Sequence, residues 1–223
     1  MRRFSIKGAY AVSKVNTTLI GLVLAGGQSR RMGQDKALMR YQGRTLIDNA
    51  SLLLQSASCD KVLISRNAPG FLNDKIEDAG PLSGVHAVLD ALSQPDNHNG
   101  NPCELLVLPV DMPQMTPELL RILVSRGREA EKACYVEKRF LPFYLPVTQK
   151  TKALLANYLV EQKKRRVVGF LEILNAVSLK EGDLKKIARK DESDNKKRLA
   201  NMSNEDGVEW LNVNTPGDWP HEK

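Results

Sequence analysis

The segment TTLIGLVLAGGQSRRMGQDK, residues 17–36, joins an apolar run to two glycines and a group of cations. The residues from Leu19 to Ala25 are apolar or glycine, which is typical of a strand buried on both faces of a sheet. Gly26 and Gly27 follow the carboxyl end of this strand. Glycines let backbone N–H groups approach a phosphate closely, and the cations that follow can neutralise its charge. The segment therefore predicts a buried strand that leads into a phosphate-binding loop.

Strand and helix patterns alternate along the residues that follow. Short apolar runs indicate strands at 61–65 and 104–110, and apolar residues at helical spacing indicate helices at 45–58, 81–93 and 116–126. Thr116 can cap the last of these helices, and Pro117 suits its first turn. This alternation predicts an α/β fold in three layers, with a mainly parallel sheet between two layers of helices. In such a sheet ligands bind beyond the carboxyl ends of the strands, where the glycines lie.

The length and composition of the chain favour one globular domain. The 223 residues are 42% hydrophobic, and no apolar run approaches the roughly 20 residues that a membrane-spanning helix needs. Residues 1–17 contain no apolar core of a signal peptide and are expected to form a flexible extension before a domain at 18–223. Cys59, Cys103 and Cys134 have neither disulfide nor zinc-ligand spacing, so we expect a cytoplasmic protein.

The net charge of +7 raises the question of nucleic-acid binding. Many of the cations lie in the segment 180–206, where acidic residues are interleaved with basic ones, and this pattern predicts a charged surface excursion. Aromatic residues make up only 5% of the chain and are not interleaved with the basic residues, so the sequence offers no stacking platform for bases. We therefore expect neither nucleic acid nor a membrane among the partners.

The glycine loop matches neither of the standard phosphate-binding patterns. It lacks GxxxxGK[ST] and GxGxxG, which excludes a P-loop and a dinucleotide fingerprint. Arg30, Arg31 and Lys36 can instead neutralise a polyphosphate, the arginines through paired donors and the lysine as a point charge.

A second informative segment is VDMP, residues 110–113. Asp111 follows a buried strand, and it could either stabilise a turn or hold a hard metal ion such as Mg²⁺. A third segment, GPLSG at 80–84 with Asp78 before it, by itself indicates only a turn ahead of a helix.

Taken together, these motifs resemble the molybdenum cofactor guanylyltransferases, a family of nucleotidyltransferases with a Rossmann-like sheet. The resemblance runs from about Thr18 to the C-terminus. Its motifs are LAGGQSRRMGQDK, GPLSG, VDMP, KKRRVVGFL at 163–171 and WLNVNTPGDW at 210–219. The first and last of these motifs are the most specific.

The resemblance implies a role for each matching residue. The nucleotide site would comprise Leu24, Ala25, Gly26, Gly27, Lys36, Asp78 and Asp111, with the arginine pair at the phosphates. Asp111 would hold Mg²⁺, and Arg31, Lys36 and Asp111 would carry the catalysis. Asn212, Asn214, Arg165 and Arg166 would lie on the molybdopterin side. Without the resemblance, the two asparagines could simply end a strand, and Arg165 and Arg166 could be surface charge.

The activity implied is transfer of GMP from GTP to the phosphate of molybdopterin, with release of pyrophosphate. Molybdoenzyme maturation chaperones or a partner GTPase would be further partners. A CTP-dependent cytidylyltransferase would use the same mechanism, but its relatives show LAAG where this chain has LAGG. A sugar-phosphate nucleotidyltransferase fits NVNTP and GPLSG poorly. A carrier without catalysis would need neither Mg²⁺ nor in-line geometry, so the presence of both Lys36 and Asp111 speaks against it.

Two positions depart from the family pattern. At the end of the second strand, where some members have a nucleotide-contacting asparagine, this chain has Ser65, and Asn67 follows two residues later. Leu141 stands where the family often has a histidine before proline.

Overall fold

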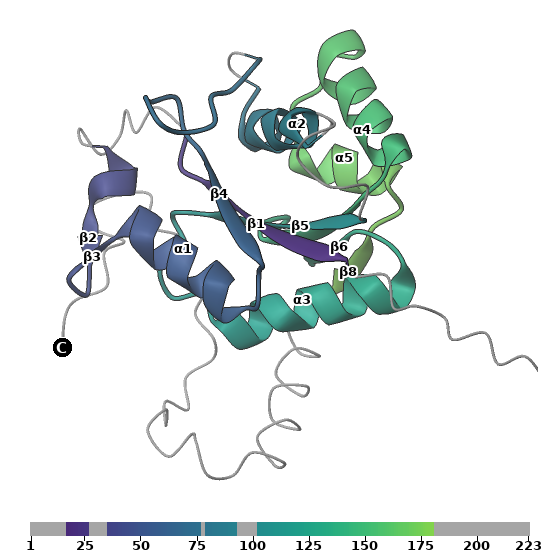
Figure 1. Cartoon of the computed structure of the whole chain (residues 1–223). Coiled ribbons are helices and arrows are strands. Elements are labelled where there is room, and N and C mark those ends of the chain that lie inside the picture. The colour runs from purple at the N-terminus through teal and green to yellow at the C-terminus, as the bar shows by residue number, and fades with distance from the viewer. Residues whose placement is uncertain (1–16, 27–34, 77–78, 93–101, 181–223) are drawn as a thin grey trace, which may run out of the picture.

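The computed structural model describes residues 17–26, 35–76, 79–92 and 102–180. A six-stranded sheet forms the centre, in the order β4-β1-β5-β7-β6-β8 (Figure 1). Its strands are β1 (Thr18–Leu24), β4 (Lys61–Ser65), β5 (Cys103–Pro109), β6 (Cys134–Val136), β7 (Phe143–Val147) and β8 (Val177–Leu179). A small hairpin of β2 (Arg40–Tyr41) and β3 (Arg44–Thr45) stands apart from this sheet.

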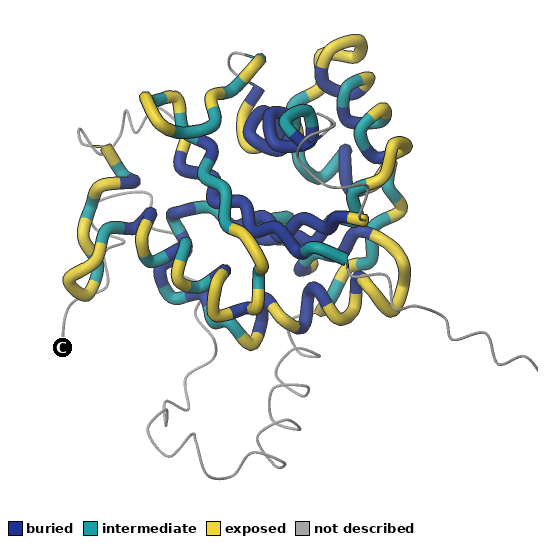
Figure 2. The backbone as a smooth tube through the Cα atoms, viewed as in Figure 1, coloured by how far each residue is buried: buried dark blue, intermediate teal, exposed yellow. Residues whose placement is uncertain are grey.

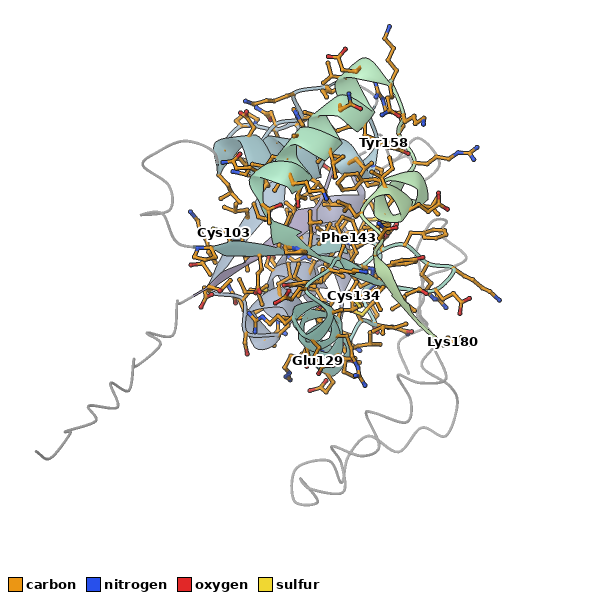
Figure 3. The ribbon with its side chains drawn as sticks, turned by 90° about the vertical axis from the view of Figure 1, so that its right-hand side faces the viewer. Cys103, Glu129, Cys134, Phe143, Tyr158 and Lys180 are labelled. Carbon is orange, nitrogen blue, oxygen red and sulfur yellow. The ribbon has the colours of Figure 1, made fainter. Side chains whose placement is uncertain are left out.

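Helices cover both faces of the sheet. They are α1 (Leu46–Ser56), α2 (Pro81–Ala91), α3 (Pro117–Ala130), α4 (Gln149–Ala156) and α5 (Val167–Ile173), with a 3₁₀ turn η1 (Lys36–Leu38) and a π-helical turn η3 (Asn157–Glu161). Figure 1 shows α1 and α3 on one side of the sheet and α2, α4 and α5 on the other. In the view turned by 90°, Glu129 of α3 and Tyr158 of η3 lie on opposite sides of Phe143 and Cys134 in the sheet (Figure 3).

Alternation along β1 explains why the sheet has a core on each face. Leu19 and Val23 pack with α1 and α3, whereas Ile20 and Leu22 pack with α2 and α4, because successive side chains of a strand point to opposite faces. Figure 2 shows the resulting buried centre and the exposed outer faces of the helices.

The predicted three-layer α/β fold with a mainly parallel sheet is confirmed. β1 pairs in parallel with β4 and β5, and β6 pairs in parallel with β8; β7 is antiparallel to both its neighbours. The predicted helix after Thr116 is present, with the Thr116 side chain accepting from the N–H of Leu119 and Pro117 in the first turn. Among the described helices, none has the length and apolar character to cross a bilayer. Residues 1–16 and 181–206, predicted as extension and excursion, lie outside the described residues.

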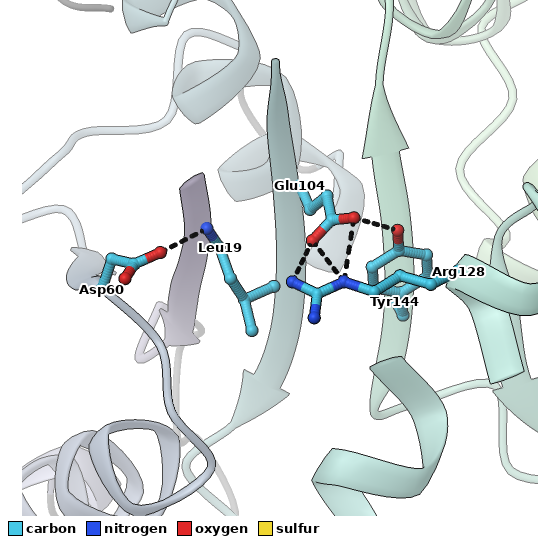
Figure 4. Close-up of polar contacts among 5 residues, drawn as sticks. All are labelled: Leu19, Asp60, Glu104, Arg128 and Tyr144. Atoms are coloured by element: carbon cyan, nitrogen blue, oxygen red, sulfur yellow. Dashed lines mark hydrogen bonds and ion pairs between the residues drawn. The ribbon is translucent and has the colours of Figure 1, made fainter. Parts of the chain in front are cut away.

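A charged cluster joins α3 to the sheet near the amino end of β5. Glu104 of β5, which is 8% exposed, accepts hydrogen bonds from Arg128 of α3 and from the hydroxyl of Tyr144 in β7 (Figure 4). The Arg128 contacts measure 2.6–3.1 Å and the Tyr144 contact 2.8 Å. Burial raises the pKa of the Tyr144 hydroxyl, so that it remains a proton donor. The partners compensate the cost of burying the Glu104 carboxylate.

We expect Glu104→Gln to lower the free energy of unfolding by about 1–3 kcal/mol, because it removes the charge that satisfies Arg128 and Tyr144. Urea unfolding followed by circular dichroism measures this change. Glu118→Gln is the control, since Glu118 pairs with Arg121 on the exposed face of α3, and its effect should stay within about 0.5 kcal/mol. Equal effects of the two substitutions would contradict a special role for the buried carboxylate.

Candidate functional site

The carboxyl ends of three adjacent parallel strands form one edge. In the register of the sheet, Leu24 of β1 lies opposite both Ser65 of β4 and Pro109 of β5. Backbone bonds extend this alignment beyond the strands, from the N–H of Ala25 to Ser65 O at 2.9 Å and from the N–H of Val110 to Leu24 O at 3.1 Å. Residues that follow these strands are therefore brought together, as expected for a ligand site in this type of sheet.

The nucleotide-loop residues predicted from the sequence begin at this edge. Leu24 and Ala25 are buried, and Gly26 is exposed. A Cβ placed on Gly26 would lie 3.8 Å from Asp74 Oδ2 and 3.9 Å from Ser65 O, which is ordinary van der Waals contact. Among the described residues, therefore, no crowding requires glycine at this position, and the bare backbone leaves room for a ligand.

Asp74 lies beside Gly26 and was missed by the sequence analysis. Its Oδ1 accepts from Ser65 Oγ at 3.2 Å and its Oδ2 from Asn67 Nδ2 at 3.3 Å, while its own N–H donates to Asn67 Oδ1 at 2.8 Å. The resemblance pointed to Asp78, which lies outside the described residues, and no signal in the sequence pointed to Asp74. Asp74 comes close to Gly26 only when the segment after β4 folds back onto Ser65.

The structure gives Ser65 and Asn67 different roles at the end of β4. Ser65 is 2% exposed, whereas the Asn67 side chain is exposed beside Asp74. A Cβ on Gly84, in the first turns of α2, would lie 2.5 Å from Ser65 Oγ and 2.8 Å from Leu24 Cδ2. Ser65 is thus covered by α2, and Asn67 is the residue of the two that a ligand can reach.

The GPLSG segment has a structural explanation in this packing. Gly80 precedes α2 with a φ of 64°, a conformation that favours glycine, and Pro81 occupies the first turn. Gly84 allows α2 to approach the end of β4. The segment therefore determines where α2 begins and how closely it packs behind the site.

Lys36 and Asp111 meet beyond the end of β5, which lies on the other side of β1 from β4. Lys36 Nζ lies 3.4 Å from Asp111 Oδ2, and the two side chains are 16% and 27% exposed. Lys36 begins η1, and Asp111 follows β5. Asn49 of α1 donates to the carbonyl of Pro113 at 3.1 Å and so holds the loop that carries Asp111. The structure thus brings together two residues that are 75 positions apart in the sequence.

The donor set at Asp111 suits a hard divalent cation that is also bound by substrate. Among the described residues, no group of three or more His, Cys, Asp or Glu side chains could hold a metal. Mg²⁺ is usually held by one or two carboxylates together with phosphate oxygens and water, so a single partly exposed carboxylate beside a phosphate site fits it.

Arg165 and Arg166 lie in the turn between η3 and α5. Arg165 Nη1 donates to the carbonyls of Leu159 at 2.5 Å and Lys164 at 3.2 Å, so part of its hydrogen-bonding capacity stabilises the turn. Arg166 has an exposed side chain, and its carbonyl accepts from Tyr158 Oη at 2.9 Å. The remaining residues predicted at the site, Gly27, Arg30, Arg31, Asp78, Asn212 and Asn214, lie outside the described residues.

Comparison with known proteins identifies relatives across most of the folded region. Residues 21–176 match the MobA-like NTP transferase domain model. The chain is 36% identical over 127 residues to "Molybdenum cofactor guanylyltransferase" of Xanthomonas euvesicatoria, covering 56% of this chain and 62% of that protein. It is 32% identical over 170 residues to the protein of the same name in Mesorhizobium japonicum, covering 69% of this chain and 78% of that protein.

A solved structure shares the fold. "Molybdopterin-guanine dinucleotide biosynthesis protein A" of Archaeoglobus fulgidus superposes with a TM-score of 0.63 over 90% of this chain and 94% of that one, at 22% sequence identity. At this identity the similarity shows the fold alone. The chain spans just under two thirds of the Xanthomonas relative, 62% of its length.

We expect Gly84→Ala to lower the free energy of unfolding by about 1–3 kcal/mol, because the added Cβ would overlap Ser65 and Leu24. Gly26→Ala is the matched control at the same edge, and its effect should remain below about 1 kcal/mol because the described neighbours leave space there. Denaturant unfolding of both variants makes the comparison. A larger loss in the Gly26 variant would contradict this view of the packing.

Proposed function

The chain belongs to the MobA-like NTP transferase domain family, and we propose that it transfers GMP from GTP to the terminal phosphate of molybdopterin. The products would be pyrophosphate and the guanine dinucleotide form of the cofactor. The names of the relatives in Xanthomonas euvesicatoria and Mesorhizobium japonicum support guanine over cytosine. Cys59, Cys103 and Cys134 form no disulfide, which fits a reducing cytoplasm as the compartment.

The observation that carries the proposal is the placement of Gly26 between two polar groups at one sheet edge. Lys36 and Asp111 lie on the β5 side, and Asp74 and Asn67 lie on the β4 side. A cation next to a carboxylate suits the metal-bound phosphates of a nucleotide. Exposed amide and carboxylate groups suit the hydrogen-bonding edges of a nucleoside.

The nucleotide would therefore lie across Gly26, with its phosphates toward Lys36 and its nucleoside toward Asp74 and Asn67. The backbone of Leu24, Ala25, Gly26 and Gly27 would contact it, and Arg30, Arg31 and Lys36 would neutralise its phosphates. Asp78 remains a second candidate for a nucleoside contact. Asp74 is supported by its position beside Gly26.

Asp111 would hold Mg²⁺. When bound, this ion would withdraw charge from the phosphate oxygens and favour departure of pyrophosphate. Lys36 Nζ, 3.4 Å from Asp111, would contact the same phosphates. Arg31 would add a paired donor to the group that transfers.

The chemical step needs little beyond positioning. An oxygen of the molybdopterin phosphate forms a bond to the α-phosphorus of GTP, and the bond from that phosphorus to the bridging oxygen breaks. Pyrophosphate leaves with the bonding electrons. The nucleophile needs no general base, because the second pKa of a phosphate monoester is about 6 and the group is already ionised at neutral pH. The protein holds two polyanions in line and stabilises the charge between them.

Asn212, Asn214, Arg165 and Arg166 are the proposed contacts of molybdopterin. The exposed side chain of Arg166 is suited to an anionic group, whereas Arg165 would act partly by shaping the turn through its bonds to carbonyls.

The first test is turnover of the purified chain with molybdopterin, Mg²⁺ and each of GTP, CTP and ATP. We expect pyrophosphate and a guanine dinucleotide with GTP, and at least about 10-fold less product with CTP, since one or two base contacts discriminate by this much. Preference for CTP would overturn the choice of base and keep the mechanism. Tight GTP binding without product would favour a carrier.

A second test addresses the metal ligand. Asp111→Asn should lower turnover with GTP at least about 100-fold, because a carboxylate ligand to the metal is lost from the transition state. The fold should be kept, as checked by circular dichroism and thermal unfolding. Glu129→Gln on the outer face of α3 is the control and should leave turnover unchanged. Wild-type turnover in the Asp111 variant would exclude it as the metal ligand.

A further inference from the structure

Asp35, the residue before Lys36, pairs with a residue at the end of β4, whereas Lys36 itself pairs with Asp111 after β5. Asp35 Oδ1 accepts from the N–H of Ala37 at 3.1 Å and so caps η1, the turn that Lys36 begins. Asp35 Oδ2 pairs with Arg66 Nη2. Both carboxylate oxygens are thus engaged, one by the turn and one by the guanidinium.

Arg66 is held in place by contacts of its backbone and of its side chain. It follows Ser65 at the end of β4, and its N–H donates to Leu72 O at 2.9 Å. Its guanidinium carbon lies 5.6 Å from the centre of the Phe71 ring, within cation–π range. The Arg66 side chain is 15% exposed, against 46% for Asp35. Arg66 is therefore held at the sheet edge by its own contacts, and Asp35 is held there by its ion pair with Arg66.

This pair differs from the ion pairs on the helix surfaces. Arg121–Glu118 and Arg126–Glu129 join residues three apart on α3, with every side chain at least 43% exposed. Such pairs contribute little. Arg66–Asp35 joins residues 31 apart and connects the end of β4 to the turn that carries Lys36. Because Lys36 in turn reaches Asp111 after β5, residues 35 and 36 bridge the two strands on either side of β1.

We propose that Arg66 and Asp35 are positioning residues for Lys36, and that their ion pair holds the lysine where the phosphates of a nucleotide would bind. The proposal rests on the proposed function, since it requires Lys36 to contact those phosphates. Lysine has a long side chain with four rotatable bonds, so the position of its backbone limits the region that its ammonium can reach. Holding the backbone at Asp35 reduces the conformational freedom that nucleotide binding would otherwise have to remove.

The test is a binding cycle with Mg²⁺ and GTP, measured by titration calorimetry on the full-length chain. Arg66→Gln removes the charge, and Asp35→Asn removes the charge while keeping an Oδ1 acceptor for the cap of η1. Each should weaken GTP binding by about 5- to 10-fold, the size expected for residues coupled through one contact. Arg66→Lys should recover part of the affinity, because it restores the charge without the guanidinium geometry.

The same substitutions are then made in a Lys36→Ala background. If Arg66 acts through Lys36, Arg66→Gln should cause no further loss of GTP affinity in this background. In the chain that keeps Lys36, the Arg66→Gln/Asp35→Asn double variant should bind GTP no more weakly than either single variant. A further 5- to 10-fold loss in the Lys36→Ala background would overturn the proposal, because Arg66 would then contact the nucleotide itself or support the site generally. Glu118→Gln, in an exposed pair, is the control.

Failure of this proposal can be separated from failure of the proposed function. If the wild-type chain binds GTP and Lys36→Ala weakens binding, but Arg66→Gln does not, the nucleotide site stands and the positioning role is wrong. If the wild-type chain does not bind GTP with Mg²⁺, the proposed function itself fails.

Discussion

The parallel pairing of β1 with β4 on one side and β5 on the other determines which chain segments meet at the site. This register aligns the carboxyl ends of the three strands, with Leu24 opposite both Ser65 and Pro109. The chain leaves all three strands in one direction, so the segments that follow them must share one edge of the sheet. This pairing brings together Asp74, Gly26 and Asp111, which come from three separate stretches of sequence.

The two ends of β5 carry charge in different ways. Near its amino end, Glu104 is buried and has its hydrogen bonds supplied by Arg128 and Tyr144. Beyond its carboxyl end, Asp111 remains partly exposed and has a lysine at 3.4 Å. A carboxylate satisfied on several sides stabilises the packing of α3, whereas one with open coordination can exchange a partner for a metal ion. The strand thus separates a carboxylate that stabilises the packing from the one that we propose as the metal ligand.

Local patterns were sufficient to predict the elements around β1, but not the far half of the sheet. The apolar runs of β4 and β5 and the capped start of α3 are signals within a few residues, and they were predicted with nearly correct bounds. β6 and β8 have only three residues each, and β7 runs antiparallel to both neighbours, so their places depend on tertiary pairing rather than on local pattern. Similarly, Lys36 and Asp111 could be named from their motifs, whereas Asp74 belongs to no motif and was not named. The burial of Ser65 by α2 and the pairing of Arg66 with Asp35 are contacts over long sequence distances, which periodicity does not encode.

Charged side chains of both signs lie at the strand ends, and this mixture suits the ligand that we propose for the site. They are Asp74, Arg66, Asp35, Lys36 and Asp111, with Arg66 paired to Asp35 and Lys36 beside Asp111. A site made only of cations would repel itself and would bind any polyanion; a site made only of carboxylates would repel phosphate. A metal-bound nucleotide would bring both signs at once, so under the proposed function Lys36 and Asp111 would each exchange their mutual contact for a phosphate oxygen and a cation. Under the positioning role that we propose for Arg66 and Asp35, their pair would persist while Lys36 and Asp111 change partners. Residues 35 and 36, which are adjacent in the chain, would then combine an ion pair that persists with one that opens when the ligand binds.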